Sequence, residues 1–403
     1  MHAWKAGLAQ RRQDAEGEGG TTKVFGGHRW IGFGLEGWGD AEEAKARRGE
    51  QQHLSLLPLS LCLCVSASLR EISSRRLWGL RTGLRGYPDD RMIGGPLGRP
   101  SLTPHPRPRS APMTPPPLFV FDIETVADPV AGGRLLDMQG APEESIAEAL
   151  RAYHLERTGG KSDFLRQPFW RVVAISYCYV EVTGNPTPWG RDTVWEGCDY
   201  RLKGVASIGT EASSEAELVG HFFAFLERKL AEGHRPCLVS WNGRGFDLPV
   251  LRYRAMLHGL SAAPLFRAGD RWANYNSRYA LDWHCDLLEA TSEFGAAARC
   301  KMDEVAALVG APGKVGVDGS QVDALYRSGE VAAIRAYCET DVVNTYLIYL
   351  RWALLTGQTT REELAAAEQD VEAYLAREGA GRPHLAEFRA AWETARALPQ
   401  PPQ

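Results

Sequence analysis

The stretch LFVFDIETV, residues 118–126, limits the possible folds of the chain most strongly, because it places two acids in an otherwise apolar predicted strand. Side chains of a strand alternate between its two faces, so Asp122 and Glu124 are predicted to share one side, and Phe121 and Ile123 the other. Burying charge is costly, and neighbouring carboxylates repel each other. Mg²⁺ or Mn²⁺, which prefer oxygen ligands, would relieve the repulsion. An edge strand with both acids in solvent is the alternative.

A second polar motif follows another apolar strand, in SWNGRGFDLPVL, residues 240–251. Asn242 ends the strand, two glycines permit a tight turn, and Phe246 stands beside Asp247. An acid at the start of a helix is also favoured by the helix dipole, so a capping role for Asp247 is the alternative to metal binding.

The third motif is AYCETDVVNTYL, residues 336–347, in a segment that reads as a helix. Tyr337 and Asp341 are four residues apart and therefore share a helix face. This spacing is also typical of a surface pair or of a buried hydrogen bond, so the motif alone indicates little.

In this order, the three motifs resemble the exonuclease motifs of the DEDD superfamily: FDIET, then N-x3-FD, then Y-x3-D. The tyrosine matches the tyrosine subclass, and Ala336 stands where the histidine subclass carries its histidine. The chain is similar to the stand-alone 3'-5' exonucleases related to the proofreading domain of B-family DNA polymerases. This similarity covers roughly residues 118–355 and includes DWHCDLLEA and VGAPGKVGVDGSQV.

The resemblance implies an α/β ribonuclease H-like fold, with a central mixed β-sheet flanked by helices. It also implies a hydrolase that removes nucleotides from 3' ends of single-stranded DNA, with two Mg²⁺ or Mn²⁺ ions at the scissile phosphate. An RNA-trimming or oligonucleotide-degrading exonuclease is one alternative. A non-catalytic nucleic-acid-binding module on a nuclease fold is another. A separate DNA polymerase or a repair complex is a candidate partner.

Residue roles follow from the same resemblance. Asp122 would bridge both ions, Glu124 and Asp341 would complete the ion that activates water, and Asp247 would hold the second ion. Tyr337 would orient the water, because a phenol with an ordinary pKa near 10 is a poor base. The expected substrate-binding residues are Asn242, Phe246, Ile123 and Thr125.

Three segments differ in composition. Residues 1–117 lack sustained periodicity, and residues 94–117 contain nine prolines, which predicts a disordered tail or a gene-model extension upstream of Met113. Residues 118–357 form the predicted exonuclease domain, and residues 358–403 a C-terminal helical tail. The apolar run at 54–69 contains a proline and begins too deep for an ordinary signal peptide, so no membrane segment is expected.

From residue 118 onward, strands alternate with helices, which is typical of a single α/β domain. The clearest helix spans residues 213–233, where Ser214 and Glu217 form a capping box. Its apolar residues fall on one face, as expected for a helix that covers a sheet. The other expected strands are 169–182, 193–197 and 236–242, and the other expected helices are 144–157, one from about Phe246, 329–357 and two beyond it.

The charge of -4 is unevenly distributed, with +6 over residues 1–117 and -10 over 118–403. Such an acidic body would meet nucleic acid only through a local basic groove or bound cations. The eight cysteines include no CxxC pair, which favours a reduced cytoplasmic protein without structural zinc.

Three further groups are weaker candidates. A metal cluster is less expected than strand-to-helix structure for Asp282, His284 and Asp286. Phosphate contact competes with an ordinary solvated surface for Arg299, Lys301 and Lys314. The segment RWANYNSRY, residues 271–279, would stack unpaired bases or pack on the core; its aromatic and basic residues are Arg271, Trp272, Tyr275, Arg278 and Tyr279.

Overall fold

The computed structural model describes residues 114–189, 192–316 and 319–397. Apart from residues 114–117, the predicted N-terminal extension lies outside these ranges, and so does the apolar run at 54–69. Within the described residues, no helix is both long enough and apolar enough to cross a membrane.

A five-stranded sheet forms the centre, in the order β3-β2-β1-β4-β5. Strand β1 pairs antiparallel with β2 and parallel with β4; β2 pairs antiparallel with β3, and β4 parallel with β5. This mixed sheet, flanked by helices, is the predicted ribonuclease H-like α/β fold. The strands are β1 Leu118–Ala127, β2 Trp170–Trp189, β3 Asp192–Ser207, β4 Cys237–Ser240 and β5 His284–Asp286.

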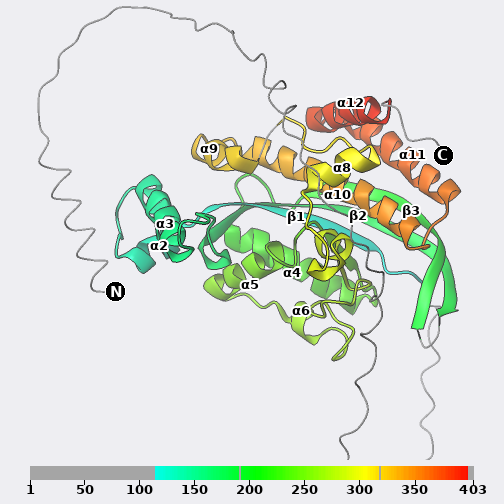
Figure 1. Ribbon diagram of the computed structural model, residues 1–403, viewed down its shortest axis with the longest axis horizontal. Coiled ribbons are helices and arrows are strands. Elements are labelled where there is room, and N and C mark those ends of the chain that lie inside the picture. Colours follow the sequence, from blue (N-terminus) through cyan, green and yellow to red (C-terminus); the bar gives the residue numbers. More distant parts are fainter. Residues whose placement is uncertain (1–113, 190–191, 317–318, 398–403) are drawn as a thin grey trace, which may run out of the picture. The chain divides into compact units, whose positions relative to one another are not determined.

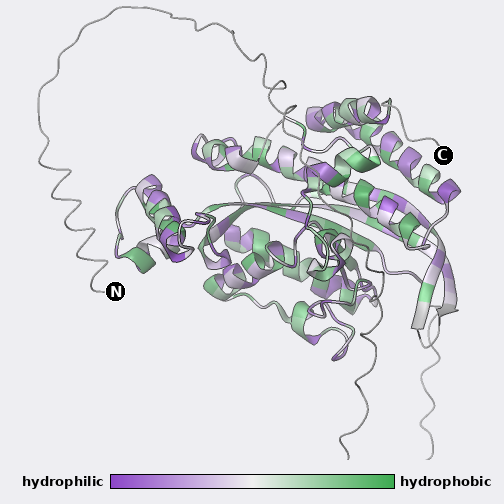
Figure 2. Cartoon of the chain, viewed as in Figure 1, coloured by the Kyte–Doolittle hydropathy of each residue, from purple (hydrophilic) through white to green (hydrophobic). Residues whose placement is uncertain are grey.

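Helices cover both faces of the sheet, with α4 and α5 on one side and α10, α11 and α12 on the other (Figure 1). Most helices carry hydrophobic and hydrophilic residues together (Figure 2), as expected for helices between a sheet and solvent. The helices are α2 Pro129–Leu136, α3 Glu143–Arg157, α4 Glu215–Ala231, α5 Asp247–His258, α6 Ala263–Arg267, α7 Leu287–Thr291, α8 Met302–Val309, α9 Val322–Arg327, α10 Val331–Leu355, α11 Arg361–Glu378 and α12 Pro383–Ala397.

Helix α4 confirms the predicted capping box, because the Ser214 side chain accepts from the Glu217 backbone and Glu217 accepts from the Ser214 backbone. The helix buries Phe222 and Leu226 in a cluster that also contains Phe119 and Phe121 of β1. On the α4 side of the sheet, β1 therefore presents the apolar side chains of Phe119, Phe121 and Ile123.

Strands β2 and β3 are longer than the sequence predicts. Residues 184–189 extend β2, and pairing continues to Trp189 opposite Asp192. The predicted strand ended at residue 182, and Gly184, Pro186 and Pro188 follow it. The hairpin continues because an irregularity between Thr183 and Asn185 absorbs the mismatch, and such bulges tolerate residues that a regular strand excludes.

Helix α10 lies at the centre of the other layer. Every residue from Tyr337 to Leu350 is buried, so the helix is covered on all sides. Helices α11 and α12 complete this cover and add Leu375 and Phe388 to the same core. The predicted boundary at residue 357 stays a prediction.

A buried ion network joins the helices to the end of β1. The Arg254 guanidinium donates to Asp128, which follows β1, and to Glu215, which begins α4, with an Nη2 to Oε2 distance of 2.6 Å to Glu215. Glu215 also accepts from the backbone of Val172 and contacts His258 at 2.8 Å. The network therefore fixes α5, which begins with Asp247, against the end of β1.

Candidate functional site

Two carboxylates of β1 face helix α10. Phe121 and Ile123 pack in the apolar cluster with α4, whereas Asp122 lies beside Cys338 of α10, with 3.7 Å between Oδ2 and Sγ. Ligand atoms of Asp122, Glu124 and Cys338 lie within 4.8 Å of one another. The predicted alternation is confirmed, and β1 lies between β2 and β4, so it is not an edge strand, although β4 pairs only with residues Leu118 to Val120.

Four carboxylates act on one another at this place. The pKa of Asp122 is raised well above its usual range, first by burial and then by the charges of Asp247, Glu124 and Asp341. Burial also raises the pKa of Glu124, followed by Asp341 and Asp247, while Lys314 opposes the shift. The three sequence motifs therefore converge on one acidic site.

Asp247 is the first residue of α5, but it does not cap the helix. The N-cap is Phe246, and the helix has no side-chain capping hydrogen bond. Burial raises the pKa of Asp247 to about 7, although backbone hydrogen bonds from Asp247 itself and from Ile123 oppose this rise. The carboxylate thus accepts both from its own N–H at the start of α5 and from the N–H of Ile123 in β1.

The turn before Asp247 requires an unusual backbone conformation and leaves little room for a side chain at Gly243. Asn242 has a φ of 64°, and a Cβ added to Gly243 would lie 2.4 Å from Ser240 Oγ. The Asp286 carboxylate accepts from the backbone N–H groups of Asn242 and Arg244 at 3.0 and 2.8 Å. These contacts fix the path of the chain into α5, which explains why the motif needs its glycine.

Tyr337 and Asp341 share a face of α10, as predicted, and the Tyr337 hydroxyl hydrogen-bonds the Asp341 carboxylate. Burial, followed by the charges of Asp341 and Glu124, raises the pKa of Tyr337 far above 10. Tyr337 therefore remains a protonated donor. The Lys314 ammonium lies 6.0 Å from the centre of the Tyr337 ring, which places one basic side chain at the site.

The donor set fits a divalent cation. Carboxylate oxygens are the ligands that Mg²⁺ and Mn²⁺ prefer, and the repulsion among these four is what a bound cation would neutralise. The residues that would hold it are Asp122, Glu124, Asp247 and Asp341. Cys338 was not foreseen, and its pKa is raised well above the usual range by burial and then by Asp122, so it stands there as a neutral thiol.

An aromatic cavity of about 380 Å³ adjoins Glu124. Its lining includes Ile123, Thr125 and Phe246, all expected to bind substrate, together with Phe164 and Trp170. The Phe164 ring centre lies 5.1 Å from that of Trp170 and 5.7 Å from that of Phe246, and Phe164 is 59% exposed. Sequence reasoning missed Phe164 and Trp170 because neither belongs to a motif. Asn242, the fourth expected substrate-binding residue, does not line this cavity.

The weaker candidates take structural positions in most cases. Asp286 caps α7 by accepting from Leu288 and Glu289, which confirms the strand-to-helix interpretation, and His284 contacts Ser240. Asp282 pairs with Arg235. Arg278 and Arg299 both pair with Glu289, and Lys301 precedes α8 as its N-cap.

Only part of the aromatic segment at 271–279 packs on the core, and the stacking role stays a prediction. Tyr275 is fully buried and donates to the Pro236 carbonyl at 2.8 Å, so it belongs to the core. Trp272 and Tyr279 are exposed, and the Arg271 guanidinium lies over the Trp272 ring.

A family model described as "Predicted 3'-5' exonuclease related to the exonuclease domain of PolB" matches residues 162–392. The matched range contains Asp247, Tyr337 and Asp341, whereas Asp122 and Glu124 precede it. No curated protein matches the chain. A similar solved structure is the family B DNA polymerase from the hyperthermophilic archaeon Pyrobaculum calidifontis, with a TM-score of 0.33 and 17% identity. The alignment covers 66% of this chain and 29% of the polymerase chain.

Proposed function

This chain belongs to the family of predicted 3'-5' exonucleases related to the exonuclease domain of PolB, and we propose that it hydrolyses phosphodiester bonds at the 3' ends of single-stranded DNA with divalent metal ions. The observation that carries the proposal is the convergence of four carboxylates. In addition to burial, the charges of Asp247, Glu124 and Asp341 raise the pKa of Asp122, and those of Asp341 and Asp247 raise the pKa of Glu124. A cytoplasmic setting and a partner polymerase or repair complex belong to the same proposal and stay predictions.

The residues of the site divide the work between them. Asp122, Glu124, Asp247 and Asp341 would hold two divalent ions, which supply an acidified water and stabilise charge on the phosphate oxygens. The Tyr337 hydroxyl has one proton, which it shares with Asp341 in the structure, and it would donate this proton to the attacking water once bound cations engage the Asp341 carboxylate. Its raised pKa excludes it as a general base at neutral pH. Lys314 offers positive charge to a phosphate next to Glu124.

The aromatic cavity supports a single-stranded substrate. A base released from a duplex can stack on aromatic rings, and each such contact contributes about 1 to 3 kcal/mol. The exposed ring of Phe164 and its partner Phe246 lie beside Glu124, where the base of the terminal nucleotide would lie.

The direct test uses matched deoxy and ribo oligonucleotides labelled at the 5' end. We expect Mg²⁺-dependent products that shorten from the 3' end, with the deoxy oligomer degraded faster. Faster degradation of the ribo oligomer would favour the RNA-trimming alternative. Internal cuts in place of a receding ladder would refute the exonuclease proposal in both forms.

Tyr337→Phe should slow cleavage without abolishing it. The change removes one hydrogen bond to the water, which we expect to raise the barrier by about 1 to 3 kcal/mol and lower the rate about 10- to 100-fold. Single-turnover cleavage rates and Mn²⁺ titrations of both proteins check this. A Tyr337→Phe enzyme as inactive as one without Asp122, but with normal metal affinity, would show that the tyrosine has another chemical role.

Phe164→Ala should weaken substrate binding more than it slows the chemical step. We expect KM for single-stranded DNA to rise about tenfold while kcat changes less than about threefold, because one stacking contact is lost. Leu308→Ala, at another exposed apolar residue, is the matched control. An abasic 3'-terminal nucleotide should remove the difference between wild type and Phe164→Ala, and an unchanged difference would contradict the stacking role.

The stability of the metal-free protein should fall as pH rises. The pKa values of Asp122, Glu124 and Asp247 are raised in the folded state, for Asp247 to about 7. Below the unfolded-state pKa of about 4 both states are protonated, and above it the unfolded state loses its protons first. Thermal unfolding with a chelator should therefore give a lower Tm at about pH 8 than at about pH 5, and Mg²⁺ should raise Tm mainly at the higher pH. A Mg²⁺ effect that is equal at both pH values would contradict these shifts.

A further inference from the structure

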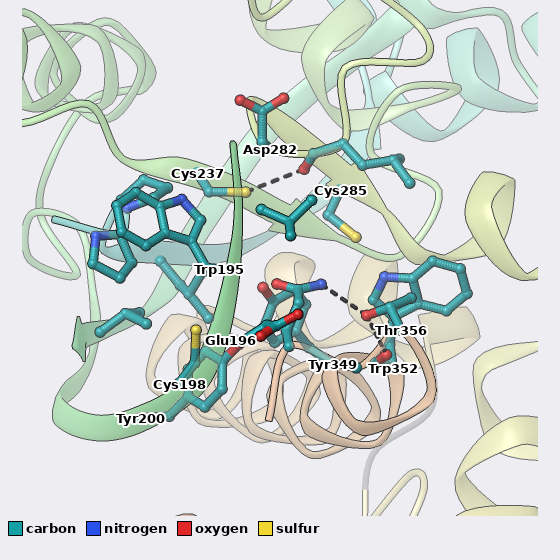
Figure 3. Close-up of a pocket in the computed structure, with 18 residues that line it drawn as sticks. Trp195, Glu196, Cys198, Tyr200, Cys237, Asp282, Cys285, Tyr349, Trp352 and Thr356 are labelled. Carbon is teal, nitrogen blue, oxygen red and sulfur yellow. Dashed lines mark hydrogen bonds between the residues drawn. The ribbon is translucent and has the colours of Figure 1, made fainter. Parts of the chain in front are cut away.

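A second cavity, of about 650 Å³, lies at the other end of β1, around Leu118 (Figure 3). We call it the strand-start cavity. Its buried lining comes from both the sheet and α10, and consists of Leu118, Val182, Cys198, Tyr200, Cys237, Cys285 and Tyr349. The carboxylate site lies toward the opposite end of the strand, so this cavity is a separate feature of the fold.

Aromatic rings form much of the wall. Trp195 of β3 and Trp352 of α10 are half-buried, and they stand on opposite sides of the cavity in Figure 3. Between them Tyr200 and Tyr349 pack edge to face, with 5.9 Å between ring centres. Aromatic-lined grooves of this kind bind proline-rich segments, because flat rings pack against the pyrrolidine faces of an extended chain.

The acidic rim of the cavity disfavours binding of a phosphate group. Glu196 and Asp282 stand at its exposed rim, and no lining residue within the described part of the chain is a lysine or an arginine. Asp282 shares its charge with Arg235, whereas Glu196 accepts a hydrogen bond from the Thr187 hydroxyl at 3.0 Å. A guanidinium is the group that such a rim accepts most readily, since it can pair with a carboxylate and stack on an indole.

The chain itself leads into this cavity. Pro115 and Pro116 belong to its wall, and the Pro117 carbonyl accepts from the Cys237 backbone at 2.8 Å, which fixes the entry point. The residues just before, 100–113, read PSLTPHPRPRSAPM and contain five prolines, Arg107 and Arg109, and no acid. Extended at about 3.1 Å per residue, this segment is long enough to fold back across the cavity.

We propose that the strand-start cavity binds the chain's own residues 100–113, with prolines against Trp195 and Trp352 and with an arginine at Glu196. The docked segment would lie on the α10 side of the sheet, as the carboxylates do, but at the other end of β1. The proposal is independent of the nuclease assignment, because it uses none of the residues placed in that site.

Hydrogen–deuterium exchange of the full-length protein tests the docking directly. We expect the amides of residues 100–113 to exchange at least about tenfold more slowly than those of the same synthetic peptide alone. Glu196→Lys should bring exchange close to the free-peptide rate, whereas Glu227→Lys, at an exposed residue of α4, should leave it slow. Trp195→Ala should also release the segment, and Glu196→Lys keeps the test valid if Trp195→Ala fails to fold.

Reversing the charges on both sides of the proposed contact gives a more specific test of the docking. Arg107→Glu combined with Arg109→Glu should speed exchange, and adding Glu196→Lys to that pair should slow it again. Free-peptide exchange rates in the wild-type protein would overturn the proposal. Protection that grows with protein concentration would also overturn it, because the occupant would then be the segment of a second copy.

Discussion

Asp122→Asn is expected to abolish cleavage while the protein stays folded. The substitution keeps the size of the side chain but removes one of four interacting charges, the one whose pKa responds to the other three. We expect a loss of at least about 1000-fold in rate, since this carboxylate contributes directly to holding the metal ions on which hydrolysis depends. Single-turnover cleavage of a labelled oligonucleotide measures the loss.

The same variant should also lose most of the Tm increase caused by Mn²⁺, while its metal-free Tm equals or exceeds that of the wild type. The reason for the gain is that a half-buried carboxylate, repelled by its acidic neighbours, is replaced by a neutral amide. Asp282→Asn is the matched control, because Asp282 is an exposed aspartate outside the site. An Asp122→Asn protein with more than about one tenth of wild-type activity would contradict the assignment.

Arg254→Met should produce the largest loss of stability. Arg254 is 3% exposed and is the buried cation that contacts both Asp128 and Glu215. Methionine preserves much of the side-chain volume but leaves two buried carboxylates without that partner. Removing one member of a buried ion network costs about 3 to 5 kcal/mol.

Urea unfolding followed by circular dichroism measures this loss. Arg228→Met is the control, because Arg228 lies on the surface of α4 and its contact with Glu232 is exposed and long, at 3.9 Å. That exposed pair should contribute less than about 1 kcal/mol. If Arg254→Met cost no more than the control, the network would not be what holds α5 against the end of β1.

Much of the fold follows from local patterns in the sequence. The alternation in LFVFDIETV indicated both the strand and the shared face of Asp122 and Glu124, because strand geometry alone fixes that relationship. The capping box at Ser214 located the start of α4 for an equally local reason. The extent of the β2–β3 hairpin did not follow, since pairing partners and bulges override the breaking tendency of single glycines and prolines.

The candidate site also has residues that the sequence identifies and residues that it does not. The four acids of the motifs could be identified from the sequence as candidate site residues, and the structure brings their charges together. Cys338 could not be selected, because its place beside Asp122 depends on how α10 crosses β1. Phe164 and Trp170 meet Phe246 only through the folding of the loop before β2, and Arg254 contacts Asp128, which lies 126 positions away in sequence. Contacts of this range leave no local signal.

The central claim is that Asp122, Glu124, Asp247 and Asp341 form one metal site. The most direct measurement is anomalous diffraction from crystals of the protein soaked in Mn²⁺. We predict anomalous density between β1 and α10, within about 2.5 Å of an Asp122 oxygen and in contact with Glu124, Asp341 or Asp247. The density should be absent from Asp122→Asn crystals treated in the same way. Manganese bound elsewhere, or an empty carboxylate site at saturating Mn²⁺, would contradict the claim.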